Sequence, residues 1–204
     1  MTKEEHVFYK NDLIASKTDD EKFYEKTLKR EQIFKGKFLD VVIDTVTLPN
    51  GKESTRELVL HPGAGAVIAF NDQDQLLVVK QFRKPFDKCL IEIPAGKKDP
   101  EDASPLVTVK RELEEETHYI ADRWKELRTT ALTCGYSNEL LTFYEASGLH
   151  LKEGSKAADE DEFLDVGWLT YDQLHQLMVD GVIIDNKTQF AYDYWTNKRL
   201  RVQK

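Results

Sequence analysis

The stretch that decides the fold runs from Gly96 to Tyr119 and reads GKKDPEDASPLVTVKRELEEETHY. Its second half predicts a helix that begins at Ser104-Pro105 and continues to about Thr117, because Ser is a favoured N-cap and Pro suits the first helical position. Apolar side chains recur along it at a spacing that turns one face toward a core. These are Leu106, Val109 and Leu113.

Three glutamates share another face of this predicted helix. Glu112, Glu115 and Glu116 stand at i, i+3 and i+4, and residues so spaced are neighbours on a helix surface. Like charges at i, i+4 destabilise a helix by roughly 0.2–0.5 kcal/mol per pair, whereas hard divalent cations prefer carboxylate oxygens. Taken alone, the cluster is either a platform for metal ions or the solvated face of an ordinary helix.

The residues before this segment predict strands. Phe38–Leu48 and Thr55–Leu60 are rich in β-branched residues, and Asn50-Gly51 between them is a strong hairpin signal. They predict a small N-terminal antiparallel β-ribbon over residues 28–60, preceded by a polar arm. Two nearly continuous apolar runs, Ala66–Phe70 and Gln75–Phe82, then predict buried strands joined as a hairpin.

The remaining elements complete a mixed α/β pattern. Short strands are expected at residues 90–93, 126–133, 140–147 and 163–169, and helices near 170–180 and 187–198. Strands with helices on both sides, but without regular βαβ alternation, indicate a mixed α/β domain.

Composition and charge exclude several classes of protein. The 204 residues favour one domain, with room for a small appendage. Asp and Glu number 37 against 29 Lys and Arg, a net charge of −8, which argues against a general nucleic-acid binder. A phosphate-containing substrate stays possible, because carboxylate-bound metal ions can supply the positive charge that it needs.

The cysteines and the hydropathy indicate the compartment. Cys89 and Cys134 are far apart and form no metal-spaced pair, so they predict reduced thiols in a cytoplasmic protein. The sequence begins without an apolar signal core, and no run approaches the roughly 20 apolar residues of a membrane span. We therefore expect no membrane partner.

The Gly96–Tyr119 segment resembles the signature of the Nudix hydrolases, in which a Gly and a Glu precede an Arg-Glu-hydrophobic-x-Glu-Glu-x-Gly-hydrophobic run. Arg111–Glu116 matches that run at every fixed position, and Tyr119 supplies the final bulky residue. The resemblance implies that Arg111 pairs with the glutamates or the loop and orients them.

The segment departs from the signature in three ways. The distance from Gly96 to Arg111 is one residue longer than in the family. The family's first Glu therefore falls on Asp102 when counted from Gly96 and on Ala103 when counted back from Arg111. The terminal Gly is His118, which should strain or redirect the helix exit, since Gly is the usual residue with φ > 0 there.

A narrower resemblance, to ADP-ribose pyrophosphatases, covers about residues 24–195. Its pieces are Thr55-Arg56-Glu57, His61-Pro62-Gly63-Ala64, Lys80–Pro85, Glu92–Gly96, Gly135–Glu139 and Asp159–Phe163. A Pro that often follows the signature in that family is Cys134 here. The resemblance implies an α/β fold, the Nudix α/β/α sandwich with a mixed sheet and the N-terminal antiparallel β-ribbon. It also implies two parts: residues 1–60 as arm and ribbon for dimerisation and base binding, and residues 61–204 as the Nudix hydrolase domain.

The resemblance further implies the roles of individual residues. It gives Mg²⁺ as the cofactor, with Mn²⁺ as a substitute, and as metal ligands the Ala95 carbonyl, Glu112, Glu115 and Glu116. It gives as catalytic residues Glu115, Glu162 and Glu160, with Glu162 the first candidate for activating the attacking water. Glu92 could also face the metals.

Two arginines are candidates for substrate binding. The resemblance puts Arg56 and Arg83 near the diphosphate or the base, and the guanidinium fork suits phosphate. The alternative is a surface Arg that pairs with a neighbour such as Glu57.

The implied reaction is Mg²⁺-dependent hydrolysis of the diphosphate linkage of ADP-ribose or a related nucleotide sugar, which yields AMP and a sugar phosphate. Two alternatives stay open: another nucleoside diphosphate compound such as GDP-mannose or a dinucleotide, and a non-catalytic nucleotide-sugar sensor. The expected partners are a nucleoside diphosphate-linked small molecule and a second copy of the chain in a homodimer, with no nucleic acid and no membrane.

Overall fold

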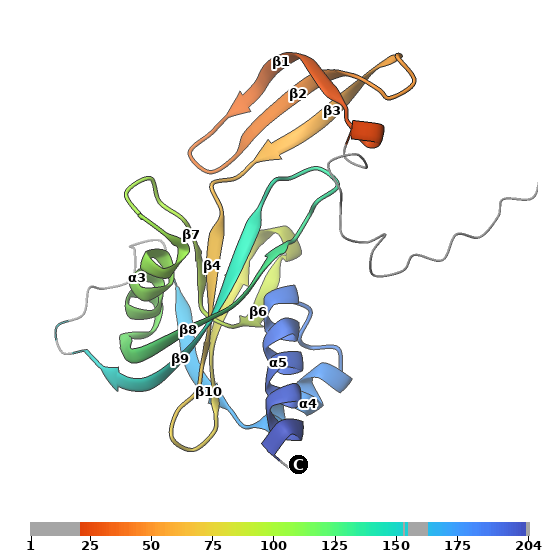
Figure 1. Ribbon diagram of the computed structural model, residues 1–204. Helices are drawn as coiled ribbons and strands as arrows, with labels where there is room; N and C mark the ends of the chain where they lie inside the picture. The colour runs from red at the N-terminus through yellow and green to blue at the C-terminus, as the bar shows by residue number, and fades with distance from the viewer. Residues whose placement is uncertain (1–20, 153, 155–162, 203–204) are drawn as a thin grey trace, which may run out of the picture. The chain divides into compact units, whose positions relative to one another are not determined.

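The computed structural model describes residues 21–152, 154 and 163–202. These form two compact units (Figure 1). The first comprises the described residues up to His61 together with Gly135–Asn138, and the second runs from Pro62 to Cys134 and from Glu139 onward. Most of the expected N-terminal arm lies outside the described residues, as do Glu160 and Glu162.

The first unit contains a three-stranded antiparallel sheet in the order β1-β2-β3. Its strands are β1 (Lys26–Lys35), β2 (Asp40–Thr47) and β3 (Glu53–Leu60). Gly51 turns between β2 and β3 at φ 81°, as the Asn-Gly pair predicts. The antiparallel ribbon is therefore confirmed. Sequence periodicity gives no clear signal for β1, because all ten of its residues are exposed.

The second unit holds two sheets. The four-stranded sheet has the order β7-β4-β9-β8, and the three-stranded sheet has the order β10-β5-β6. β4 pairs with β9 in parallel and with β7 antiparallel, so the larger sheet is mixed. The strands are β4 (Ala64–Ala69), β5 (Leu76–Arg83), β6 (Lys88–Glu92), β7 (Ala95–Lys97), β8 (Tyr119–Ala131), β9 (Leu140–Leu151) and β10 (Leu164–Leu169), and the helices are η1 (Lys84–Phe86), α3 (Pro105–Thr117), α4 (Tyr171–Val179) and α5 (Asn186–Val202).

The expected hairpin of Ala66–Phe70 and Gln75–Phe82 is wrong. Both strands form, but β4 and β5 lie in different sheets and are joined by a single bridge between Phe70 and Leu76. β9 pairs with one edge of β4 along its whole length, and β7 pairs with the other edge over Ala64–Ala66, so β4 finds its partners elsewhere than in β5. An apolar run predicts a buried strand without naming its partners.

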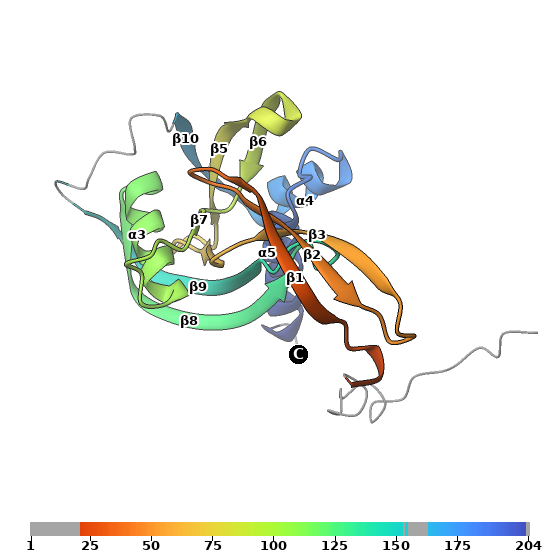
Figure 2. The ribbon, with the colours of Figure 1, turned by 90° about the horizontal axis from the view of Figure 1, so that it is seen from above.

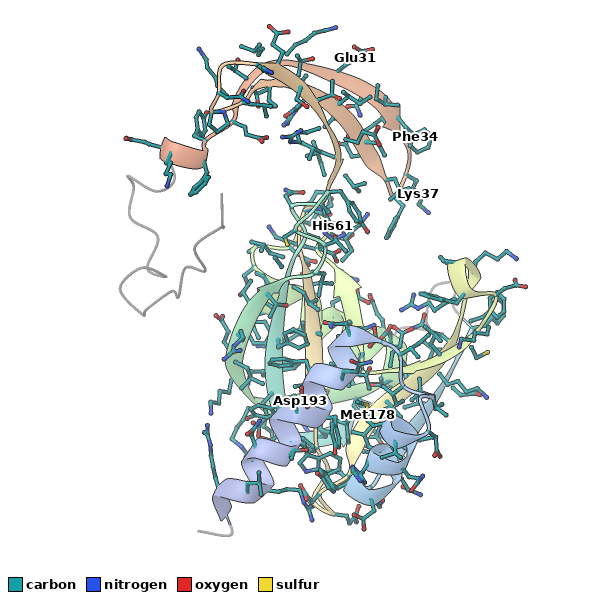
Figure 3. The ribbon with its side chains drawn as sticks, turned by 90° about the vertical axis from the view of Figure 1, so that its right-hand side faces the viewer. Glu31, Phe34, Lys37, His61, Met178 and Asp193 are labelled. Atoms are coloured by element: carbon teal, nitrogen blue, oxygen red, sulfur yellow. The ribbon has the colours of Figure 1, made fainter. Side chains whose placement is uncertain are left out.

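Alternating side chains of β4 build cores on both faces of the sheet. Ile68 packs in a cluster with Leu174 of α4 and Trp195 of α5, whereas its neighbour Val67 packs in a cluster with Leu113 of α3. Figures 1 and 2 show α3 on one side of the sheets and α4 and α5 on the other. Figure 3 shows α4 and α5 side by side, with Met178 and Asp193 labelled on them. The expected α/β/α sandwich is thus confirmed.

The helix of the signature has the predicted limits. It starts at Pro105 after the N-cap Ser104 and ends at Thr117, and its core-facing Val109 and Leu113 are fully buried. His118 takes the left-handed C-cap conformation, φ 60° and ψ 11°, and its backbone N–H donates to the Glu114 carbonyl at 2.8 Å. The helix therefore ends as it would with Gly.

The strand after this helix begins earlier than expected. β8 starts at Tyr119 rather than at residue 126, because the left-handed turn at His118 leads the chain directly into pairing with the far end of β9. Among the described residues, no helix has the length and apolar character needed to cross a membrane.

Candidate active site

Arg111 gathers four carboxylates around one guanidinium. Its Nη1 lies 2.9 Å from Glu112 Oε1 and 2.9 Å from Glu115 Oε2, and its Nη2 lies 3.1 Å from Asp99 Oδ2 and 3.2 Å from Asp102 Oδ2. Burial opposes the positive charge, but these neighbours, Glu112 foremost, raise the pKa of Arg111 above its ordinary value. Arg111 thus orients two of the glutamates and the loop, as expected.

Asp102 is a buried acidic residue of the loop before α3. Its buried carboxylate accepts hydrogen bonds from the Asp99 amide at 3.0 Å, the Thr108 hydroxyl at 2.9 Å and Arg111 at 3.2 Å. Burial favours protonation, but these bonds prevail and hold the pKa of Asp102 below its usual value. Since Ala103 is exposed, counting from Gly96 identifies the acid, and the extra residue lies between Asp102 and Arg111.

Gly96 lets the glutamate face approach the backbone of β7. A Cβ at this position would lie 1.9 Å from Glu112 Oε1, closer than two non-bonded atoms can come. The glycine is therefore required for space. The approach places the Glu112 carboxylate against the strand that also carries Ala95.

Arg83 is paired with Glu92 and not with a glutamate of α3. Its Nε and Nη2 donate to the two oxygens of Glu92, each at 2.7 Å. This bidentate bond foremost, and the charges of Glu116 and Asp185 besides, raise the pKa of Arg83. Glu116 is itself buried, at 5% exposure.

The chemistry of these donors fits a divalent cation. Buried and half-buried carboxylates beside a glycine backbone supply the hard oxygens that Mg²⁺ prefers. Within residues 21–152, 154 and 163–202, however, no three His, Cys, Asp or Glu side chains converge as a set of metal ligands. The carboxylates of Glu112 and Glu115 instead point toward Arg111 and form ion pairs with it.

The other expected site residues lie elsewhere. Arg56 belongs to the first unit, where its Nε donates to Glu25 Oε2 at 2.8 Å. Its partner is therefore a glutamate other than Glu57. Glu160 and Glu162 lie outside the described residues, so their role as catalytic glutamates stays a prediction.

Sequence reasoning missed the group at the start of α5. The ammonium of Lys187 pairs with Glu92 and with Asp185, and the buried hydroxyl of Thr188 accepts from the Ile93 amide at 2.9 Å. The only local signal is Asp185, a typical N-cap before a helix. Nothing near it indicates a partner 95 residues away in the sequence.

A sandwich in which one helix presents an Arg-Glu-x-x-Glu-Glu face beside a glycine strand is the arrangement of a Nudix domain. The family model "NUDIX domain" matches residues 59–187, and "Nucleoside diphosphate sugar hydrolase N-terminal domain" matches residues 25–59. The chain belongs to the Nudix family, whose hydrolases generally need divalent metal ions.

Two characterised relatives cover most of the chain. It is 45% identical over 172 residues to the "Methanol dehydrogenase activator" of Bacillus methanolicus, which covers 84% of this chain and 92% of that one. It is 41% identical over 181 residues to the "ADP-ribose pyrophosphatase" of Bacillus subtilis (strain 168), which covers 88% and 97%.

More distant similarities agree on the fold. A "GDP-mannose pyrophosphatase" of Yersinia pestis is 30% identical over 142 residues, covering 65% of this chain and 70% of that one. The solved structure "Crystal structure of ADP compounds hydrolase" matches with a TM-score of 0.75 and 19% identity, over 88% of this chain and 95% of that one. This structure shares the fold.

Proposed function

We propose that the chain is a Nudix pyrophosphohydrolase that cleaves the diphosphate linkage of ADP-ribose or a related nucleotide sugar and releases AMP and a sugar phosphate. The observation that carries the proposal is the glutamate face of α3, brought against the backbone at Gly96 and held there by Arg111. The relative of Bacillus subtilis supports ADP-ribose as the substrate.

The working cation in this proposal is Mg²⁺, and Mn²⁺ can substitute. Its ligands are the carbonyl oxygen of Ala95 and the carboxylates of Glu112, Glu115 and Glu116. A bound divalent cation supplies Lewis-acid stabilisation of the charge on the diphosphate and lowers the pKa of a water nucleophile.

The protein's own groups orient the substrate and move the proton. Arg111 keeps Glu112 and Glu115 on one side of the helix. Arg83 binds a phosphate oxygen, and Arg56 is a second substrate-binding arginine. Glu162, or Glu160 in second place, accepts the proton of the attacking water.

The test is the Glu116→Gln variant, which keeps the size of a buried side chain and removes its charge. We expect Mg²⁺-dependent AMP release from ADP-ribose to be abolished, because neutral amides bind hard cations weakly, while circular dichroism shows an intact fold. Turnover near that of the wild type would contradict the metal assignment.

The substrate itself is tested by a panel. ADP-ribose, GDP-mannose and a dinucleotide are compared by kcat/KM, and we expect ADP-ribose to give the highest value. A higher value for GDP-mannose would support the alternative to which the relative of Yersinia pestis points. Tight binding of ADP-ribose without AMP release, in Mg²⁺ or Mn²⁺, would instead support a sensor.

A second candidate function is the activation of a partner enzyme. It rests on the 45% identity to a "Methanol dehydrogenase activator". Its test measures methanol oxidation by a methanol dehydrogenase with and without this chain. Stimulation that persists with Glu116→Gln would separate activation from hydrolysis, and no stimulation would remove this candidate.

We further propose a cytoplasmic homodimer that binds no nucleic acid. Cys89 and Cys134 are free and exposed, which suits a reducing compartment, and the net charge of −8 disfavours polyanions. The first unit exposes apolar side chains that a second copy could cover. These are Phe23, Tyr24, Leu28, Ile33, Phe34, Phe38 and Leu39.

A further inference from the structure

The start of α5 is bonded to the strand that leads into the candidate site. Asp185 Oδ2 accepts hydrogen bonds from the Thr188 backbone N–H at 2.9 Å and from its hydroxyl at 2.6 Å. The same hydroxyl accepts from the Ile93 amide at 2.9 Å. Because Ile93 lies directly before Pro94-Ala95-Gly96, the helix start anchors the segment that carries Ala95.

Glu92 carries the charge of this junction. Its carboxylate is almost completely buried and receives both nitrogens of the Arg83 fork at 2.7 Å. Lys187 bonds the Oε2 atom of the same carboxylate and also donates to Asp185 Oδ1 at 2.8 Å. Two cations and two carboxylates therefore balance one another where β5, β6 and α5 meet.

Only one member of this group is turned toward solvent. The side chain of Arg83 is 38% exposed, whereas those of Glu92 and Lys187 are 2% and 14% exposed. The two hydrogen bonds that Arg83 donates to Glu92 use Nε and Nη2, so its third nitrogen, Nη1, takes no part in this pair. Arg83 thus presents one edge of its guanidinium outward while Glu92 holds the other edge.

The position of Arg83 depends on the charge balance behind it. A buried carboxylate that loses a partner is strongly destabilised. Without Lys187, the buried carboxylate of Glu92 and the partly buried carboxylate of Asp185 would keep Arg83 as their single cation, and Arg83 would be held more tightly by them. A guanidinium held more tightly by carboxylates is less able to bind a phosphate.

We propose that Lys187 is a positioning residue that, by sharing the Glu92 carboxylate, sets the direction of Arg83 and leaves one edge of its guanidinium open to a substrate phosphate. The inference rests on the proposed function, because it describes how that site takes a nucleoside diphosphate. Lys187 touches no substrate and acts through Glu92 and Arg83.

A purely structural role predicts a different result. If Lys187 served only to hold α5 on the sheet, its loss would lower the melting temperature and leave substrate affinity unchanged. If it positions Arg83, its loss raises KM with little change in kcat. This pattern is expected when the lost interaction stabilises the bound substrate and the transition state equally.

The experiment compares Lys187→Met, Lys187→Gln and Lys187→Arg with the wild type in steady-state hydrolysis of ADP-ribose with Mg²⁺. We expect KM to rise about tenfold in the Met variant with kcat within about threefold, and Lys187→Arg to restore KM. Lys187→Gln keeps a polar group and gives the same test if the Met variant does not fold. The matched control is Lys198→Met on the same helix, whose ammonium pairs with Glu145 at 2.6 Å and whose KM should not change.

A double-mutant cycle decides whether the effect passes through Arg83. In an Arg83→Gln background, Lys187→Met should raise KM by less than about twofold, because coupled residues are not additive. An equal rise in both backgrounds, or an unchanged KM in Lys187→Met, would overturn the proposal.

A binding measurement separates this inference from the proposed function. Calorimetric titration with α,β-methylene-ADP-ribose, which cannot be hydrolysed, should show about tenfold weaker binding to Lys187→Met than to the wild type. A wild type that hydrolyses no compound of the panel refutes the proposed function, and the titration then still tests the position of Arg83. An active wild type with equal affinity in the variant refutes this inference alone.

Discussion

Gly96 lies in β7, whose backbone pairs with β4 from Ala64 to Ala66, so the strand cannot move away from α3. A Cβ added to Gly96 would meet three side-chain atoms of Glu112, the nearest at 1.9 Å. Single atoms therefore decide whether the glutamate face reaches the strand. The same is true of Arg111, where a single nitrogen, Nη1, sets the directions of two glutamates.

Replacing Gly96 by Ala should push the Glu112 carboxylate away from the strand. We expect kcat/KM to fall about 100-fold, because a displacement of about 1 Å in a catalytic group costs that much, with the fold retained. Steady-state kinetics measure the loss. The control is Gly167→Ala in β10, where a Cβ meets no atom within 4 Å, and equal activity in the two variants would contradict the role of Gly96.

The loop before α3 and the C-cap after it both differ from the Nudix signature, and the helix nevertheless forms. The longer loop ends on Asp102, which still reaches Arg111. His118 replaces the usual Gly and nevertheless takes the left-handed conformation at the C-cap. The element keeps its limits because buried Val109 and Leu113 fix its packing, and the two ends adapt.

Asp102 makes the loop sensitive to acid. Its pKa is lowered in the folded protein, so its contribution to stability is present above the unfolded pKa of about 3.9 and is lost as pH falls through the folded value. We expect Asp102→Asn to lower the free energy of unfolding at pH 7 by about 2 kcal/mol, as measured by urea denaturation. The difference from the wild type should shrink as pH falls below about 4, and a constant difference down to pH 2.5 would contradict this assignment.

The C-cap of α3 is expected to be a place where stability can be gained. A non-glycine residue in the left-handed region costs about 1–2 kcal/mol, of which the entropy of Gly offsets about 0.5–1 kcal/mol. We expect the His118→Gly variant to be more stable than His118→Ala by about 1 kcal/mol in the free energy of unfolding. Its melting temperature should be correspondingly higher. The Ala variant removes the imidazole and keeps the Cβ, so equal stability of the two variants would refute strain at this position.

The whole molecule consists of two units with different surfaces. In the first unit, large apolar side chains are exposed on and beside β1, and Phe34 is labelled among them in Figure 3. In the second unit, both faces of β4 are buried between α3 and the pair α4 and α5. The exposed apolar side chains of the first unit are therefore available to a covering partner.

The proposed homodimer gives the prediction at this scale. We expect the wild type to sediment as a dimer and Phe34→Asp to shift it toward the monomer, because a charge in an apolar interface loses its hydration. Analytical ultracentrifugation measures both. Val179→Asp changes an exposed apolar residue of α4 in the second unit and should leave the dimer intact. A monomeric wild type would refute the proposal.

Sequence by itself determined the helix from Pro105 to Thr117, its glutamate face and the family, because spacing along one helix places residues on one face whatever surrounds it. Tertiary structure alone decided that both Asp99 and Asp102 reach Arg111, that β4 and β5 part into two sheets, and that Glu92 is shared by Arg83 and Lys187. The contact of Lys187 with Glu92 joins residues 95 positions apart in the chain. Such contacts depend on how whole elements pack and on which buried charges must be paired, and no local pattern records that.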